Sequence, residues 1–311
     1  MHRFSTVIGR TAAALALTML AACGGKGSGD GAPAAAPAGP PPTPTLAQLE
    51  SATVSGVFAT PVTLASGRYD GPPVEPGAAS HPTLLLWSPA VAYGDVDGAA
   101  GNEAIALLSS NEGGSGEMVW VAVFGVRDGQ LANLATAQVG DRVRLQTMWL
   151  EQGRIVMDVV EPGPSDPACC PTQVARRIYA LSGGTLQQQK NEVLGVLGVS
   201  LLTTNEWQLV SIDGEPLPKD AKPPVIHFER DGVRGFAGCN RFNAPVTETK
   251  PGEITIGPAA GTKMACPPEK MDVEQRFLTQ LALVNRYSYQ AEQLALSWQD
   301  KDRTGTLLFR K

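Results

Sequence analysis

Apolar and polar residues alternate with a period of two along most of the chain between residues 47 and 190. The alternation is clear at 143–149, and the runs 118–124 and 155–159 are further apolar-rich segments of strand length. Side chains two positions apart share one face of a strand, so the alternation predicts strands with one buried face. Glycine-containing turns such as Asp128-Gly129 separate the runs and are typical of hairpins. We predict an antiparallel, all-β N-terminal module at 47–190.

The last third of the chain, residues 203–311, combines strand patterns with one helical pattern. Val273, Phe277, Leu281 and Val284 recur at helical spacing soon after Pro267-Pro268, which suits a first helical turn. We expect this apolar face to pack on a sheet. The prediction is an α+β domain, an antiparallel sheet with one amphipathic helix, so that the whole protein is mainly β with two domains. Residues 191–202 are expected to be a linker, although the run 193–199 could instead be packed.

The N-terminus has the pattern of a bacterial lipoprotein signal peptide at 1–22. Two arginines precede an apolar run that is too short for a mature membrane span, and the run ends in Leu20-Ala21-Ala22-Cys23. We expect cleavage before Cys23 and attachment of palmitate-type acyl chains to it. Gly24 follows where an aspartate would favour the inner membrane, so we expect the outer membrane, facing the periplasm. Residues 23–46 are rich in Gly, Ala and Pro and are predicted to be a disordered tether.

The formal net charge is -5, and it is unevenly placed along the chain. Residues 203–311 carry 14 basic and 14 acidic side chains, so the acidic excess lies in the N-terminal part. Neither part has a basic stripe, and we expect no nucleic-acid partner. The partners that remain are the membrane, through the lipid anchor, and an envelope protein.

Two short motifs lie in the C-terminal domain. The first is Gly238-Cys239-Asn240-Arg241-Phe242, and the second, at 262–267, contains Thr262, Met264 and Cys266. Together with the strand patterns around them, they resemble the META domain, the family of the HslJ-like heat-shock lipoproteins, over residues 203–311. The N-terminal region resembles, more loosely, modules of other META-containing envelope lipoproteins.

The resemblance implies an envelope location and a role in envelope integrity or in tolerance of heat and of novobiocin-type antibiotics. It implies no catalytic residue. We expect a disulfide bond between Cys239 and Cys266, which would close a long loop. Asn240 and Arg241 could face a ligand, but asparagine also suits tight turns, and we favour a structural role.

An acidic loop in the N-terminal module could bind calcium. Asp95, Asp97 and Glu103 lie on a glycine-containing segment, and Ca²⁺ prefers several oxygen ligands. Ala99 stands where a third ligand would be needed, however. The alternative is a solvated turn in which the aspartates hydrogen-bond to the local backbone. We expect no other cofactor.

Cys169 and Cys170 are adjacent in the N-terminal module. They could form a vicinal disulfide, or one of them could pair elsewhere. In an oxidising envelope a structural disulfide is the expected outcome. Paired C-x-x-C spacing is absent from the sequence, which argues against zinc and against redox catalysis.

The sequence favours a non-catalytic protein. A hydrolase would have to use His81 or His227, and no G-x-S-x-G, H-E-x-x-H or nucleotide-binding motif occurs. A second hypothesis is an inhibitor or chaperone-like binder of envelope proteins, such as cell-wall hydrolases. A hydrolase is the third.

Overall fold

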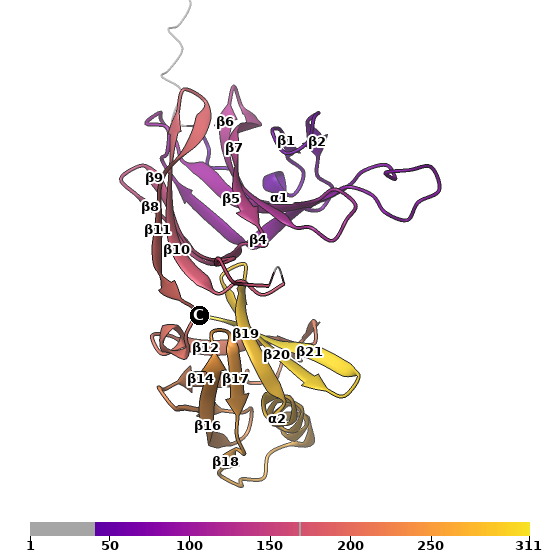
Figure 1. Cartoon of the computed structure of the whole chain (residues 1–311), viewed down its shortest axis with the longest axis vertical. Helices are drawn as coiled ribbons and strands as arrows, with labels where there is room; N and C mark the ends of the chain where they lie inside the picture. Colours follow the sequence, from indigo (N-terminus) through magenta and orange to yellow (C-terminus); the bar gives the residue numbers. More distant parts are fainter. Residues whose placement is uncertain (1–40, 168) are drawn as a thin grey trace, which may run out of the picture. The chain divides into compact units, whose positions relative to one another are not determined.

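The computed structural model describes residues 41–167 and 169–311 (Figure 1). The predicted signal peptide, Cys23 and the predicted tether up to residue 40 lie outside the described residues. Residues 41–45 are irregular, and helix α1 (Leu46–Leu49) begins at the last residue of the predicted tether. Thr45 and Gln48 form a capping box that fixes this start. None of the helices in the described part is both long enough and apolar enough to cross a membrane.

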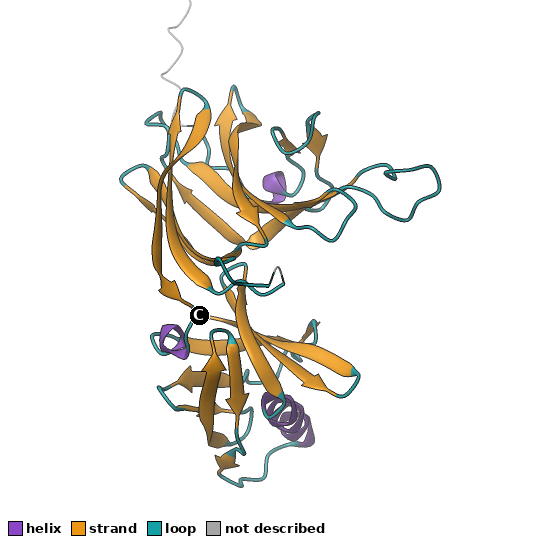
Figure 2. Ribbon diagram, in the orientation of Figure 1, coloured by secondary structure: helices purple, strands orange, loops and turns teal. Residues whose placement is uncertain are grey.

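Strands dominate the described chain, as the orange ribbon in Figure 2 shows, which confirms the mainly β prediction. The N-terminal module contains two antiparallel sheets, with strand orders β3-β4-β5-β6-β7 and β11-β10-β9-β8, and a small β1–β2 hairpin. The strands are β1 (Thr53–Val54), β2 (Val62–Thr63), β3 (Arg68–Asp70), β4 (Thr83–Gly94), β5 (Glu103–Asn111), β6 (Met118–Arg127), β7 (Gln130–Asp141), β8 (Arg144–Glu151), β9 (Arg154–Glu161), β10 (Gln173–Ser182) and β11 (Thr185–Val196).

The core of the module is formed by inward-facing residues of both sheets, among them Ile105, Val121 and Met157. A second cluster covers the other face of the first sheet, where Leu49 of α1 packs with Leu84 and Phe124. Strand β5 is therefore buried on both faces. This double burial explains why its sequence is continuously apolar over Ala104–Leu108 rather than alternating.

The C-terminal domain is an eight-stranded antiparallel barrel. Its strand order is β12-β14-β15-β16-β17-β19-β20-β21, and β21 pairs back onto β12. Short strands β13 and β18 pair with β12 and β16. The bounds are β12 (Glu206–Ile212), β13 (Glu215–Pro216), β14 (Val225–Phe228), β15 (Gly232–Phe236), β16 (Arg241–Lys250), β17 (Glu253–Ile256), β18 (Ala260–Gly261), β19 (Val284–Gln290), β20 (Gln293–Asp300) and β21 (Arg303–Arg310). The antiparallel sheet was predicted, whereas its closure was not.

Helix α2 (Pro268–Leu281) is the predicted amphipathic helix. Val273, Phe277 and Leu281 are buried on one face, as expected, while Val284 begins β19 instead of extending the helix. The Phe277 ring lies 5.8 Å from that of Phe242 in an edge-to-face arrangement. The helix therefore packs its apolar face onto the barrel core.

The segment expected to be a linker, 191–202, begins as an exposed strand and ends in packed structure. Strand β11 continues to Val196, and a 3-10 helix, η1, spans Val199–Leu202. Leu197, Val199 and Leu202 are buried in the cluster that forms the core of the C-terminal barrel. Of the two possibilities for the apolar run 193–199, the structure therefore has the packed one at its C-terminal end.

Candidate functional site

The first motif forms a turn that lies against helix α2. Gly238 has φ 123°, and a Cβ at this position would lie 3.4 Å from the carbonyl oxygen of Lys270. Glycine is needed here because the backbone adopts a positive φ and the helix backbone passes close by. The next two backbone N–H groups, of Cys239 and Asn240, both donate to Glu274 Oε2, at 3.1 and 2.5 Å.

Asn240 connects this turn to the second motif. Its Nδ2 donates to Glu274 Oε1 (2.9 Å), and its Oδ1 accepts from Thr262 Oγ1 (2.8 Å) and from the backbone N–H of Met264 (2.7 Å). Cys239 and Cys266 are disulfide-bonded next to it, with their Cα atoms 6.0 Å apart. The motif residues thus bind each other and the helix, so their role in this structure is to hold the domain together.

Three motif side chains lie outside this network. Phe242 is buried in the barrel core, and Arg241 is exposed, while its backbone N–H donates to Thr262 Oγ1 and its carbonyl accepts from the Thr262 N–H. Met264 uses its backbone in the network, while its side chain is 57% exposed. The sequence did not predict Glu274, because an acidic residue on a helix has no local signal that it will be buried.

The acidic loop residues do converge. Ligand atoms of Asp95, Asp97 and Glu103 lie within 4.8 Å of one another. Five of their six carboxylate oxygens already accept hydrogen bonds, however. Backbone N–H groups of residues 96, 98 and 99 supply three donors. The Arg127 guanidinium bonds to both Asp97 and Glu103. The cluster is an internal ion pair around Arg127, and its geometry matches the turn alternative better than a calcium site.

Cys169 and Cys170 are bonded to each other. Asp166 organises their loop by accepting from the backbone N–H groups of Gly163 (2.8 Å) and Thr172 (2.6 Å). Burial raises the pKa of the Asp166 carboxyl, but these hydrogen bonds outweigh it and leave that pKa below its usual value. Arg286 of β19 donates to Cys170 Sγ, so the loop rests against the C-terminal barrel.

The two histidines considered for catalysis lie in different parts of the fold. His81 precedes β4, with Nδ1 3.7 Å from Asp70 Oδ1, and His227 is in β14 of the C-terminal barrel.

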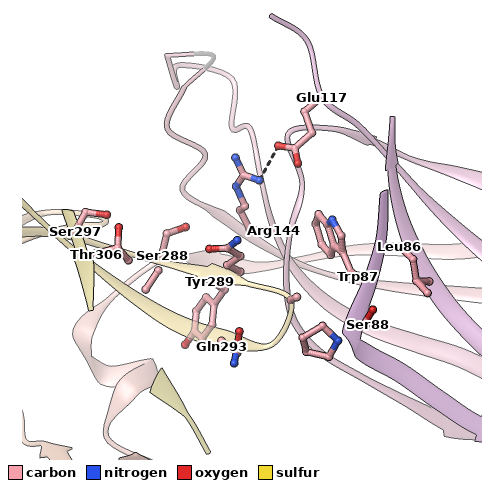
Figure 3. Close-up of a pocket in the computed structure, with 14 residues that line it drawn as sticks. Leu86, Trp87, Ser88, Glu117, Arg144, Ser288, Tyr289, Gln293, Ser297 and Thr306 are labelled. Atoms are coloured by element: carbon pink, nitrogen blue, oxygen red, sulfur yellow. Dashed lines mark hydrogen bonds and ion pairs between the residues drawn. The ribbon is translucent and has the colours of Figure 1, made fainter. Parts of the chain in front are cut away.

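A cavity of about 510 Å³ is a further feature that the sequence did not predict. It is lined by β4, by the start of β8 and by strands β19–β21 (Figure 3). On the β4 side the ladder with β5 is interrupted between Leu86 and Val91. Trp87, Ser88 and Pro89 lie in this irregular segment, where a proline costs no ladder hydrogen bond. The bulge thereby turns Trp87 and Ser88 to the cavity wall.

The opposite wall comes from the C-terminal barrel. Ser288, Tyr289 and Gln293 of the β19–β20 hairpin line it with Ser297 and Thr306, and Figure 3 shows these side chains on the yellow strands. Arg144 and Glu117 form an ion pair of 2.7 Å at the cavity, drawn as the dashed line.

The β19–β20 hairpin is tied to β8 at its tip. Ala291 and Glu292 both have positive φ, 47° and 68°, which non-glycine residues adopt at a cost of about 1–2 kcal/mol each. Glu292 Oε1 accepts from the Met148 N–H (2.6 Å), and the Glu292 N–H donates to the Leu145 carbonyl (3.2 Å). Gln146, the extra residue of a bulge in β8, donates to Tyr289 Oη at 3.3 Å. These bonds fix the hairpin that forms one cavity wall.

The family comparison concerns the C-terminal domain. The model of the META domain matches residues 200–310. One solved structure, described as the NMR structure of a protein, is 26% identical over 37% of this chain and 94% of its own, with a TM-score of 0.30. Another, the NMR structure of a protein from Burkholderia xenovorans, is 28% identical over 36% of this chain and 84% of its own, with a TM-score of 0.29. No curated protein matches the chain. Residues 200–310 of this chain are therefore a META domain.

Proposed function

We propose that this protein is a non-catalytic binding protein of the bacterial cell envelope, anchored by lipid on Cys23 to the outer membrane and facing the periplasm. The observation that carries the proposal is the network around Asn240. The residues that distinguish the META motif form hydrogen bonds with Glu274, with Thr262 and with each other. Since the motif serves the scaffold, we assign the function to a surface that the scaffold presents.

The compartment is supported by independent features. The pattern at 1–23 is that of a lipoprotein precursor. Both cysteine pairs of the folded part are disulfide-bonded, and disulfides persist in oxidising compartments such as the periplasm.

The anchor is tested by metabolic labelling with a palmitate analogue, in cells that produce the full chain or its Cys23→Ser variant. We expect label and membrane association for the full chain and loss of both in the variant. Equal labelling of the two chains, or none in either, would contradict the anchor.

The role in envelope integrity is tested with a deletion strain exposed to heat and to novobiocin. The full chain should restore growth, and the Cys23→Ser variant should not. A variant that joins residues 203–311 directly to the anchor tests which domain acts. Because the cavity needs both domains, we expect this short variant to fail, and full rescue by it would place the function in the META domain alone.

A second candidate, binding of an envelope protein, is favoured by β11. This strand is at the edge of its sheet, and Val193, Leu194 and Val196 are 57%, 47% and 63% exposed. An exposed edge with apolar side chains can pair with a strand of another protein. Co-elution of the chain with a lysozyme-type cell-wall hydrolase on size exclusion, abolished by Leu194→Asp, would favour this candidate.

A further inference from the structure

The polar side chains of the cavity are mostly uncharged. Apart from Tyr289, whose hydroxyl accepts from Gln146, six of them are hydroxyls or amides: Ser88, Ser288, Gln290, Gln293, Ser297 and Thr306. Each can both donate and accept a hydrogen bond. A ligand that matches this wall must itself carry many groups that donate and accept, as hydroxyl-rich molecules do.

Among the described residues that line the cavity, Glu117 and Arg144 are the only charged ones, and they neutralise each other. Glu117 Oε2 accepts from Arg144 Nη1 at 2.7 Å, and the two side chains are 32% and 27% exposed. The lining therefore has no formal net charge to attract a strongly anionic or cationic ligand. A paired guanidinium and carboxylate can still bind vicinal hydroxyls, since one donates and the other accepts.

Trp87 adds an apolar surface to this polar wall. Its indole N–H is already bonded to Ser109 Oγ at 3.2 Å, so the ring offers its carbon surface rather than its donor. Sugar rings have one face of C–H groups that packs on such a surface, with hydroxyls at the rim that reach polar neighbours. Aromatic side chains combine this contact area with a low entropic cost.

We propose that the cavity binds a neutral oligosaccharide. Its volume, about 510 Å³, is within the range of about 300–1,000 Å³ for small-ligand sites and accommodates a short segment of a glycan. A lipid chain does not fit a wall of hydroxyls and amides, and an acidic glycan finds no unpaired cation among the lining residues. The inference rests on the proposed function as a binding protein and names the ligand class of its site.

The test is calorimetric titration of the full chain, purified in a zwitterionic detergent without a sugar headgroup, with a β-1,4-linked tetramer of N-acetylglucosamine. A tetramer in which alternate sugars carry a carboxylate serves as the charged comparison. We expect saturable binding of the neutral tetramer and at least about tenfold weaker binding of the acidic one. Absence of binding to the neutral tetramer, or preference for the acidic one, would overturn the proposal.

Three variants localise the binding. Trp87→Leu should weaken it by about tenfold, since it removes the stacking surface, and Ser297→Ala by about fivefold, since it removes one hydroxyl with little disturbance of β20. Trp149→Leu is the matched control, because Trp149 is a half-buried tryptophan of the same module that stacks with Arg176 outside the cavity. If Trp87→Leu unfolds, Ser297→Ala and Trp87→Phe decide. Unchanged binding in Ser297→Ala and in the folded Trp87 variant, or equal losses in Trp149→Leu, would overturn the location.

This titration does not depend on the lipid anchor. A chain that binds the tetramer but fails to restore the deletion strain contradicts the envelope role and leaves the site intact. A chain that restores the strain but binds no tetramer contradicts the ligand class alone.

Discussion

Glu274 Oε2 in helix α2 accepts the backbone N–H of Asn240 at 2.5 Å, and the Glu274 side chain is buried there. The same carboxylate accepts from the Cys239 N–H and from Asn240 Nδ2. Three donors thus converge on one acidic group, which satisfies backbone N–H groups that the turn leaves without partners. The helix and the motif turn are held together by this group.

Glu274→Gln should destabilise the protein by roughly 1–3 kcal/mol. The amide replaces one acceptor oxygen by an NH₂ group, which would face a donor, and the remaining hydrogen bonds lose the assistance of the charge. The measurement is denaturant unfolding followed by circular dichroism. Glu269→Gln, in the exposed first turn of the same helix, is the control and should change stability by only a few tenths of a kcal/mol. Equal effects of the two substitutions would contradict the role of Glu274.

The disulfide between Cys239 and Cys266 should contribute more to stability than the one between Cys169 and Cys170. The first joins residues 27 positions apart, and in the chain-entropy model a loop of that size stabilises by about 3–4 kcal/mol. The second joins neighbours and restricts little of the unfolded chain. Replacing each pair by serines and comparing the unfolding midpoints measures the difference. The expectation fails if both double variants lose the same stability.

The strands and the helix could be predicted because their signals are local. The apolar run at 118–124 and the helical spacing of Val273, Phe277 and Leu281 each lie within one element. Barrel closure was not predictable in this way, since Leu209 pairs with Phe309, a hundred positions away. The burial of Glu274 and the cavity were not predictable for the same reason: both depend on contacts between distant parts of the chain. The cavity wall combines Trp87, Arg144 and Thr306, and only the folded topology brings these positions together.

The ion pair of Arg177 and Glu161 should be costly to break. The two side chains are 12% and 7% exposed, and the guanidinium also donates to the Val139 carbonyl of the other sheet. Glu161→Gln leaves a buried, unpaired charge, which we expect to cost about 3–5 kcal/mol. Arg234→Met is the control. It removes a pair with Glu229 whose members are 61% and 51% exposed, and it should cost less than about 1 kcal/mol. Thermal or denaturant unfolding of the two variants measures these losses of stability. Similar losses in Glu161→Gln and Arg234→Met would refute the larger cost of breaking the buried pair.

Tyr289 should make the protein lose stability in alkaline solution. Burial raises the pKa of its hydroxyl to about 12 from an ordinary value of 10.0, against the smaller, lowering effect of the Gln146 hydrogen bond. The unfolded chain therefore releases the Tyr289 proton at a lower pH than the folded chain. The contribution of the protonated Tyr289 hydroxyl to the free energy of unfolding is complete below pH 10 and is lost as the pH rises towards 12. The difference corresponds to roughly 3 kcal/mol.

Tyr289→Phe removes this titration and should flatten the fall in the free energy of unfolding over that interval. Below pH 9 the variant and the wild type should instead follow parallel curves, with a constant offset for the lost hydrogen bond to Gln146. Burial also raises the pKa of Tyr287 and Tyr179, so part of the alkaline slope should persist in the variant. Urea unfolding at a series of pH values measures both slopes. If they coincide above pH 10, the Tyr289 hydroxyl is hydrated in solution and the hairpin does not stay docked against β8.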